Sequence, residues 1–429
     1  MSTSPLADSP PSPPRRRWRF SLRTLLVAFT IAALAAAWSG VPLQRALRQR
    51  AIVESLKKVA TVRYASPNKR WQSNRWLRAW LGDAALLEVE SVHFTTTEED
   101  INVSLSRLLG LKRLQCLDLR GKPVTDAGLA NLREFTSLQE LRLTDTLVTD
   151  AGLSHLAGMT DLKILDLGAR VRVVEWTSGI ESVEANTTLN RSPLTDAGLV
   201  HLRPLNRLEQ LRLNGTEVGG RGLTHLRGMS ELVLLKLEGT PLTDEGMTFI
   251  GEFQQLWDLE LGHTRVTDAG LLHSKRLPVL NTISLRGTLV TDAGLTHLSD
   301  RLWLRHVDLG ATAVTDQGLA HLSDLFLYDL SLDGTHVSDD GMAYLSEMKW
   351  LTTLELANTQ VTDAGLASLC GLTDWMQHLG LNGTKVTDQG LSYLIGMTGM
   401  HSLRLRNTQV TDAGLVHLQG MKSLRFLDV

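Results

Sequence analysis

Apolar residues follow a pattern that returns about every 24 residues along most of the chain. In the unit 138–159, Leu141 and Leu143 lie two positions apart, as expected for a short strand with one buried face. Leu153 and Leu156 follow at a spacing that places both on one side of a helix. A strand and a helix of this size cannot bury their own apolar faces, so each unit must pack on the next. The pattern therefore predicts a solenoid rather than a globular enzyme domain.

Each helix is predicted to begin at a Thr-Asp pair. Thr149 is a favourable N-cap residue, and Asp150 lies in the first turn, where the helix dipole favours an anion. Gly152 replaces the Glu of a full capping box, and we expect its missing side chain to allow neighbouring turns to approach closely. The gap from Thr149 to Thr195 is about 46 residues, which indicates an insertion of roughly one repeat's length. The pairs begin at Thr125, Thr149, Thr195, Thr243, Thr267, Thr291, Thr315, Thr362, Thr387 and Thr411, with degenerate copies at Gly219 and Ser338.

The apolar strand residues predict the architecture of the repeat array. Val89, Val92 and Phe94 mark the first strand. Parallel strands lie about 4.8 Å apart, whereas packed helices need roughly 10 Å. Because of this mismatch we expect an α/β horseshoe with a parallel sheet on its concave face and helices on its convex face. The later strands are centred on Leu117, Leu141, Leu165, Leu211, Leu235, Leu259, Ile283, Val307, Leu330, Leu354, Leu379 and Leu403.

These motifs resemble leucine-rich repeat proteins, and are most similar to the subclass with repeats of the form Leu-x-x-Leu-x-Leu-x-x-Cys-x-Ile-Thr-Asp-x-Gly-Leu-x-x-Leu. The resemblance covers residues 89–429, in about 13 repeats. In that subclass the repeats often serve as substrate receptors of ubiquitin ligases, but such receptors need an adaptor-binding domain upstream, where this chain carries an apolar segment. At the Cys position the chain has Thr, whose hydroxyl we expect to bond a backbone group of the turn. These residues are Thr146, Thr216, Thr240, Thr264, Thr288, Thr312, Thr335, Thr359, Thr384 and Thr408.

The N-terminal segment predicts a membrane anchor. Residues 1–19 form a Pro- and Arg-rich tail that we expect to be disordered and cytoplasmic. Residues 20–44 contain an uncharged run long enough to span a bilayer as a signal-anchor helix. A cleaved signal peptide is the alternative, because Ala35-Ala36-Ala37 offers a small-residue cleavage site. Both alternatives place the repeats outside the cytoplasm, on a single-pass membrane protein or on a secreted one.

The stretch from Arg15 to Leu26 is also similar to the start of many membrane-anchored proteins from planctomycete-type bacteria. Several of those proteins carry repeats close to Thr-x-Val-Thr-Asp-Ala-Gly-Leu. This resemblance implies a bacterial envelope protein and indicates no particular biochemical activity.

Residues 45–88 form a basic, Trp-rich juxtamembrane segment. Residues 1–80 carry 15 Lys and Arg against 2 acidic residues, so the remainder of this nearly neutral chain has a net charge of −15. Basic residues interleaved with Trp beside a membrane favour contact with anionic headgroups. The alternative is a helix containing Trp76, Leu77, Trp80 and Leu81 that caps the first repeat. Nucleic acid is not an expected partner, because an exported segment rarely meets it.

Residues 168–193 interrupt the pattern after the strand at Leu165. Within them, residues 171–183 predict a β-hairpin that includes Glu175 and Trp176. Long loops on regular scaffolds often carry function, so this insertion either binds a ligand or is a tolerated scar of a duplication.

Other candidate chemistry has structural explanations. A His recurs in Gly-Leu-x-His-Leu, but helices about 10 Å apart would not easily let neighbouring imidazoles share a metal ion. The helix start accounts for the one Asp per repeat, which is too few for calcium. Cys116 and Cys370 are some ten repeats apart, beyond disulfide reach. The chain has no Gly-rich phosphate loop, no Gly-x-Ser-x-Gly and no His-Glu-x-x-His, so we expect no metal, no cofactor and no enzymatic activity.

Strand residues that point away from the core form the candidate binding surface. They are polar and vary between repeats, as suits recognition of a protein or glycan through complementary charge. They include Asp118, Glu140, Arg142, Ile164, Asp166, Gln210, Arg212, Leu234, Lys236, Asp258, Glu260, His306, Asp308, Asp329, Glu355, His378 and Arg404. Ile164 and Leu234 are the apolar exceptions and indicate a hot spot. The candidate site is Arg142, Ile164, Asp166, Arg212, Leu234, Lys236, Glu260, Asp308 and Glu355, with Glu175 and Trp176 of the insertion.

The sequence thus predicts a membrane-anchored, non-catalytic recognition scaffold at the cell envelope. The alternative function is a structural envelope protein. In the printed sequence no capping segment follows the last strand, at 424–429, and an unpaired strand edge favours self-association.

Overall fold

The computed structural model describes residues 23, 26–31, 43–57, 59–65, 84, 87–95, 101–111, 113–169, 192–372 and 375–429. The hairpin predicted in the insertion and the capping helix predicted around Trp76 lie outside these residues. The chain divides into two compact units, one of Met1–Glu54 with Ser66–Leu87 and one of Ser55–Ala65 with Glu88–Val429. Helix α2 (Leu43–Leu56) lies mostly in the first unit. Within the described ranges, no helix has both the length and the apolar character needed to cross a bilayer.

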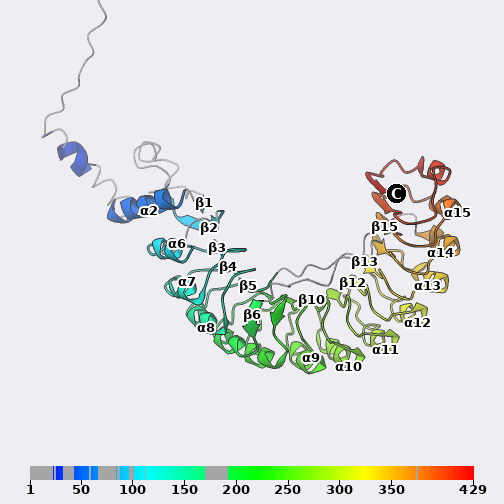
Figure 1. The fold of residues 1–429 in the computed structure, drawn as a ribbon, viewed down its shortest axis with the longest axis horizontal. Helices are drawn as coiled ribbons and strands as arrows, with labels where there is room; N and C mark the ends of the chain where they lie inside the picture. Colours follow the sequence, from blue (N-terminus) through cyan, green and yellow to red (C-terminus); the bar gives the residue numbers. More distant parts are fainter. Residues whose placement is uncertain are drawn as a thin grey trace, which may run out of the picture. The chain divides into compact units, whose positions relative to one another are not determined.

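The second unit is built on one sheet of 15 strands, which follow one another in chain order. All pairs from β2 onward are parallel. Within this unit the strands lie on the concave side and the helices on the convex side, which confirms the predicted fold (Figure 1). The strands are β1 (Ala60–Tyr64), β2 (Val89–Phe94), β3 (Cys116–Asp118), β4 (Glu140–Arg142), β5 (Ile164–Asp166), β7 (Gln210–Arg212), β9 (Leu234–Lys236), β10 (Asp258–Glu260), β11 (Thr282–Ser284), β12 (His306–Asp308), β13 (Asp329–Ser331), β14 (Thr353–Glu355), β15 (His378–Gly380), β16 (Ser402–Arg404) and β17 (Phe426–Asp428).

The register of the sheet places equivalent repeat positions side by side. Leu165 of β5 pairs with Leu211 of β7, which pairs with Leu235 of β9, and all three leucines are fully buried. The predicted strand centres are therefore confirmed. Because β5 pairs directly with β7, the insertion between them leaves the sheet continuous. A separate pair of short strands, β6 (Ser192–Thr195) and β8 (Thr216–Glu217), lies just after it.

An antiparallel strand at the beginning of the sheet was not predicted from the pattern. β1 pairs with β2, from Ala60 opposite Phe94 to Tyr64 opposite Val89. The prediction that the strand at 89–94 is the terminal one is therefore wrong. Pairing with β1 supplies partners for backbone groups of β2 that would otherwise form an open sheet edge.

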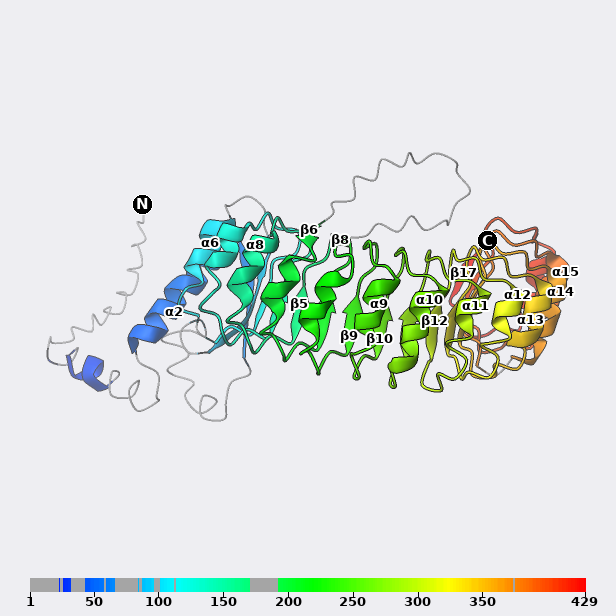
Figure 2. The ribbon, with the colours of Figure 1, turned by 90° about the horizontal axis from the view of Figure 1, so that it is seen from below.

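The convex side carries one short helix in most repeats, seen in a row in Figure 2. The α-helices are α6 (Ile101–Arg107), α7 (Asp126–Ala130), α8 (Asp150–Leu153), α9 (Asp244–Ile250), α10 (Asp268–Leu271), α11 (Asp292–Leu295), α12 (Asp316–Leu319), α13 (Asp339–Leu345), α14 (Asp363–Ser368) and α15 (Asp388–Ser392). The 3₁₀ segments are η1 (Ser154–Leu156), η2 (Gly198–Leu202), η3 (Arg221–Leu226), η4 (Leu272–Arg276), η5 (Leu369–Gly371) and η6 (Gly414–Leu418). In η2, η3 and η6 the 3₁₀ turn replaces the predicted α-helix. Leu199 and Leu202 are three residues apart, which matches the three-residue turn of a 3₁₀ helix.

The Thr that replaces the Cys of the repeat motif closes the turn after the strand in ten repeats, as predicted. Thr312 donates its hydroxyl hydrogen to the carbonyl of Leu309 at 2.6 Å. The other nine Thr residues of the series make the same bond three residues back. A buried hydroxyl is thereby satisfied inside each repeat.

The Asp that follows each helix-starting Thr joins one repeat to the next. The carboxylate of Asp292 accepts two bonds from Thr315 of the following repeat, from its N–H at 2.8 Å and from its hydroxyl at 2.6 Å. Related pairs are Asp126–Thr149, Asp150–Thr195, Asp244–Thr267, Asp268–Thr291, Asp316–Ser338, Asp339–Thr362, Asp363–Thr387 and Asp388–Thr411. We call this series the Asp–Thr ladder.

The ladder corrects the interpretation that a helix N-terminus alone accounts for each Asp. The predicted cap bond is absent at Thr149, whose hydroxyl donates to Asp126. It is confirmed in five other helices, at Thr267, Thr291, Thr315, Thr362 and Thr387. The close approach predicted for the Gly is confirmed. A Cβ atom at Gly318 would lie 2.3 Å from the Asp292 carboxylate oxygen, so the carboxylate occupies the space that the missing side chain leaves open.

Candidate recognition surface

Three outward positions per repeat line the concave face of the sheet. They are the first and third residues of each strand and the residue two positions beyond it, because side chains of an extended chain alternate between faces. The structure places all described members of the predicted site at the first two of these positions: Ile164 and Leu234 at strand starts, and Arg142, Asp166, Arg212, Lys236, Glu260, Asp308 and Glu355 at strand ends. Glu175 and Trp176 lie outside the described residues.

Several charged members of the predicted site form ion pairs across the sheet. Lys236 forms an ion pair with Glu260 of the next strand. Glu355 of β14 accepts a bond from Arg404 of β16 at 2.7 Å, although β15 lies between these two strands. These pairs hold the charged groups in fixed positions on a rigid face.

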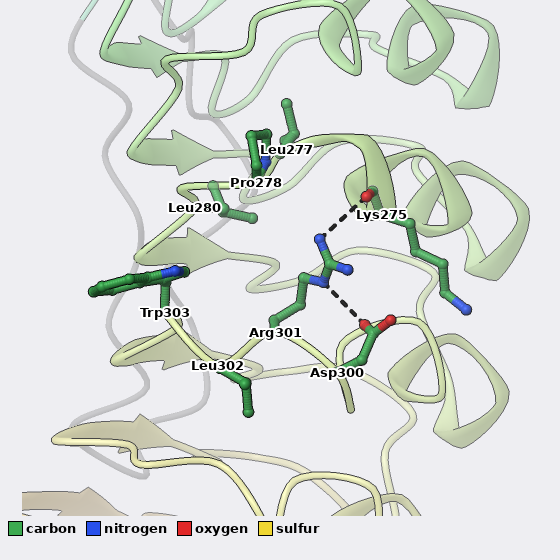
Figure 3. Close-up of a pocket in the computed structure, with 8 residues that line it drawn as sticks. All are labelled: Lys275, Leu277, Pro278, Leu280, Asp300, Arg301, Leu302 and Trp303. Atoms are coloured by element: carbon green, nitrogen blue, oxygen red, sulfur yellow. Dashed lines mark hydrogen bonds and ion pairs between the residues drawn. The ribbon is translucent and has the colours of Figure 1, made fainter.

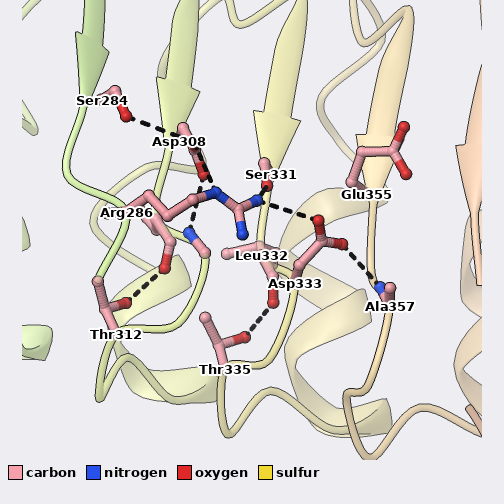
Figure 4. Close-up of polar contacts among 12 residues, drawn as sticks. Ser284, Arg286, Asp308, Thr312, Ser331, Leu332, Asp333, Thr335, Glu355 and Ala357 are labelled. Atoms are coloured by element: carbon pink, nitrogen blue, oxygen red, sulfur yellow. Dashed lines mark hydrogen bonds and ion pairs between the residues drawn. The ribbon is translucent and has the colours of Figure 1, made fainter. Parts of the chain in front are cut away.

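Arg286 organises the centre of the surface, and sequence analysis missed it. Its guanidinium lies 3.0 Å from Asp308 and 3.0 Å from Asp333, and it donates to the Ser331 hydroxyl at 2.9 Å (Figure 4). Arg286 and Asp333 occupy the position two residues beyond the strand. The alternation of the strand, continued past the second leucine, was the available sequence signal.

The N-terminal part of the face contains a buried acid. Asp118 is buried beneath Arg120, which lies 2.7 Å away, and His93, at 2.8 Å. Burial alone would raise the pKa of Asp118, but side-chain and backbone hydrogen bonds from Arg120 outweigh it and lower that pKa. Asp118 lies at an outward strand position, as predicted, but the side chains of Arg120 and His93 cover its carboxylate.

Carboxylates outnumber cations on the central part of the face. Between β9 and β14 the three outward positions carry Glu238, Asp258, Glu260, Asp308, Asp329, Asp333 and Glu355, which we call the acidic patch, against Lys236 and Arg286. Seven carboxylates therefore face two permanent cations.

Three members of the acidic patch have raised pKa values. Burial and then the charge of Glu260 raise the pKa of both Asp258 and Glu238. Burial also raises the pKa of Glu355, partly offset by Arg404. One buried carboxylate oxygen of Asp258, Oδ1, accepts no hydrogen bond within the described part of the chain. A cation near this carboxylate would oppose its raised pKa by stabilising the charged form.

The two predicted apolar hot-spot residues do not meet. The register places Ile164 opposite Gln210 and Gln210 opposite Leu234, so one polar residue lies between them.

A shallow pocket lies at the edge of the sheet where the strands begin. It has a volume of about 360 Å³ and is lined by Lys275, Leu277, Pro278, Leu280, Asp300, Arg301, Leu302 and Trp303 (Figure 3). Arg301 closes one side by bonding Asp300 at 2.9 Å and the carbonyl of Lys275 at 3.1 Å. No cluster of His, Cys, Asp or Glu among the described residues could hold a metal ion.

Comparisons with known proteins agree with this architecture. A family model described as a leucine-rich repeat matches residues 347–370. An internalin (inlF) from Listeria monocytogenes has a similar structure with 20% identity and a TM-score of 0.51, over 82% of this chain and 93% of the internalin. A leucine-rich repeat protein from Leptospira interrogans is 13% identical with a TM-score of 0.46, over 75% of this chain and 91% of that protein. A comparison with curated protein sequences gives no significant match.

Proposed function

Because the chain is a leucine-rich repeat protein, we propose that it acts as a non-catalytic scaffold that recognises a protein partner through the acidic patch. The observation that carries the proposal is the excess of acid in this patch, where seven carboxylates face two permanent cations. A Lys or Arg side chain of a partner would provide a compensating charge and charge-assisted hydrogen bonds to exposed carboxylate oxygens of the patch. The partner surface that fits is therefore basic.

The surrounding ion pairs support this proposal because they limit the cost of binding. Lys236 and Glu260 already hold one another, and Arg286 is fixed by Asp308 and Asp333. Side chains that are ordered before binding lose less conformational entropy in the complex. Asp258 and Glu238 lie next to this fixed frame, with pKa values raised by burial, so a cation that approaches them favours their charged forms.

We further propose that the scaffold is tethered to a membrane through residues 20–44, with residues 1–19 cytoplasmic and residues 45–88 next to the lipid. The support is the length of the uncharged run and the Arg residues before it. Digestion of intact cells with an external protease tests the arrangement. Cleavage of the repeats at the cell surface is expected, and full protection would contradict it.

Cross-linking in envelope extract, with the full chain as bait, tests recognition by the acidic patch. The informative variant is Asp258→Asn with Glu238→Gln, which removes charge at nearly constant volume. The matched control is Glu347→Gln, an exposed acid outside the concave face. A basic partner captured by the wild type and the control, but lost from the double variant, supports the proposal. Equal capture by all three proteins would refute it.

Self-assembly is the second candidate function, and the last strand favours it. Leu427 of β17 is 38% exposed, whereas its neighbour in register, Leu403, is fully buried. An exposed apolar strand edge can pair with another chain. Concentration-dependent oligomers that Leu427→Glu abolishes would favour assembly, and a monomer at all concentrations would dismiss it.

A further inference from the structure

Two polar residues interrupt the apolar framework on the convex side, and they lie in neighbouring repeats. Ser274 stands where the other repeats from Thr125 onward have a buried Leu or Ile, and Arg301 stands where they have a buried Leu, Met or Phe. The first series is Leu132, Leu156, Leu202, Leu226, Ile250, Leu298, Leu322, Leu345, Leu369, Leu394 and Leu418, and the second is Phe135, Met159, Leu205, Met229, Phe253, Leu277, Leu325, Met348, Leu372, Met397 and Met421. We infer that the pocket beside Arg301 binds a small carboxylate that carries a planar apolar group. This site is separate from the acidic patch.

The two exceptions meet at the pocket. Ser274 is fully buried and donates its hydroxyl to the carbonyl of Leu271 at 2.7 Å. Arg301 reaches back to the repeat of Ser274, where its Nη1 donates to the carbonyl of Lys275 at 3.1 Å. The pocket of about 360 Å³ lies beside this contact. Packing alone does not favour an arginine here, because a guanidinium loses its contacts with water when it replaces a buried apolar side chain.

The guanidinium of Arg301 keeps a hydrogen-bond donor for a ligand. Its Nε donates to Asp300 at 2.9 Å, and its Nη1 is held by the carbonyl of Lys275. Its Nη2 makes no hydrogen bond to any residue that the structure describes, and the side chain is 16% exposed. A carboxylate is the group that a fixed guanidinium binds best, through short charge-assisted hydrogen bonds. The two existing bonds already orient this donor, which limits the entropy lost on binding.

The charges around the pocket favour a ligand with a single negative charge. Figure 3 shows the guanidinium with Lys275 and Asp300 on one side and the apolar lining on the other. The hydrogen bond from Arg301 and, to a smaller extent, the charge of Lys275 lower the pKa of Asp300, so this acid is ionised. Two cations and one carboxylate leave one positive charge. This balance disfavours a metal cation, and it is too small for a phosphate dianion.

The remaining lining is apolar and partly open to solvent. Leu302 and Trp303 are 62% and 61% exposed, and Pro278 and Leu280 lie beside them. A ligand that covers these side chains removes apolar surface from water, whereas a bare acetate or a sugar would not match them. The indole of Trp303 favours an aromatic group, because aromatic rings attract one another when they stack or meet edge to face. The volume is at the lower end of the range for small-molecule pockets, about 300–1,000 Å³, so the ligand is small.

Fluorine NMR of 4-fluorophenylacetate in the presence of the full chain tests the inference, with the neutral 4-fluorophenylacetamide as the matched probe. The test variant is Arg301→Met, which restores the residue type of the framework, and circular dichroism melting verifies that it folds. The control is Lys349→Met, which removes an exposed cation outside the pocket. We expect the wild type and the control to bind the acid equally. Arg301→Met should bind the acid at least about 10-fold more weakly, and the wild type should bind the amide more weakly by a similar factor.

Three results would overturn the inference. They are no binding of the acid up to about 10 mM, equal binding of acid and amide by the wild type, and equal binding of the acid by the wild type and Arg301→Met. The comparison of acid with amide needs no variant, so it decides the question even if Arg301→Met fails to fold.

The same chemistry has two sources, a free acid and the C-terminal residue of a peptide. The tripeptide Gly-Gly-(4-fluorophenylalanine) distinguishes them: tighter binding than 4-fluorophenylacetate supports a peptide end, and weaker binding supports a free acid. The Asp258→Asn, Glu238→Gln variant should bind 4-fluorophenylacetate like the wild type. Failure of this inference and failure of recognition by the acidic patch are therefore distinguishable.

Discussion

At the scale of single residues, the turn after each strand requires a left-handed backbone. Glycine meets this requirement in many repeats, but Ala311 has a φ of 53° and no polar side chain that could compensate. An L residue in this region is strained by roughly 1–2 kcal/mol. We expect Ala311→Gly to raise the free energy of unfolding by about 1 kcal/mol, seen as a higher urea midpoint. Ala343→Gly in α13 is the control, and should lower stability by a similar amount because it lies in a helix.

Protonation of Asp388 at low pH should weaken the last contact of the Asp–Thr ladder. Hydrogen bonds from the N–H and hydroxyl of Thr411 lower the pKa of Asp388 below its unfolded value. The stabilisation is therefore complete above the unfolded pKa of about 3.9, and is lost as the pH falls through the folded pKa. Hydrogen exchange at Thr411 and Gly414, corrected for intrinsic rates, should accelerate as the pH falls below about 4. In Asp388→Asn these amides should exchange fast at every pH, and an identical pH profile in both proteins would contradict this assignment.

At the scale of elements, the Asp–Thr ladder makes each helix start a contact between repeats. Asp292→Ala removes the acceptor of two bonds from Thr315, and hydrogen bonds to charged groups contribute about 1.5–3 kcal/mol. We expect a loss of about 2 kcal/mol in stability, with faster hydrogen exchange on both sides of α12. Asp324→Ala, an exposed acid outside the ladder, should leave both unchanged.

A double-mutant cycle identifies the origin of that loss. If the ladder bond is responsible, Thr315→Val should cost less in the Asp292→Ala background than in the wild type, because only the cap bond from the Gln317 N–H is then left to lose. Fully additive effects would mean that Asp292 acts only through the helix dipole, as the sequence interpretation had it.

At the scale of the whole molecule, the features that depend on residues within a single repeat could be predicted from the sequence. Leu141 and Leu143 must be buried for any repeat to pack, so the strands and their register follow from spacing alone. The side-chain contacts between repeats could not be predicted in the same way. Arg286 reaches Asp333 two strands away, and Asp292 serves the next repeat, because stacking and curvature set these distances. The antiparallel strand β1 was missed for the same reason. It pairs with the edge of the repeat array, and the residues of β1 alone do not show that this edge is near.

Replacement of the insertion can test stability of the repeat array and partner binding separately. The N–H of Ala169 donates to the carbonyl of Asn214, and the N–H of Ser192 donates to that of Gly215, so both ends of the insertion are anchored at adjacent residues. A short Gly-Ser linker in place of 170–191 should therefore close the gap without strain, and change stability by about 0.5 kcal/mol or less. Circular dichroism melting and urea midpoints measure this change. A larger loss would mean that the insertion supports the sheet. If stability is kept and a partner is lost in the cross-linking experiment, the binding site extends to Glu175 and Trp176; if the partner is kept, the sheet face alone carries recognition.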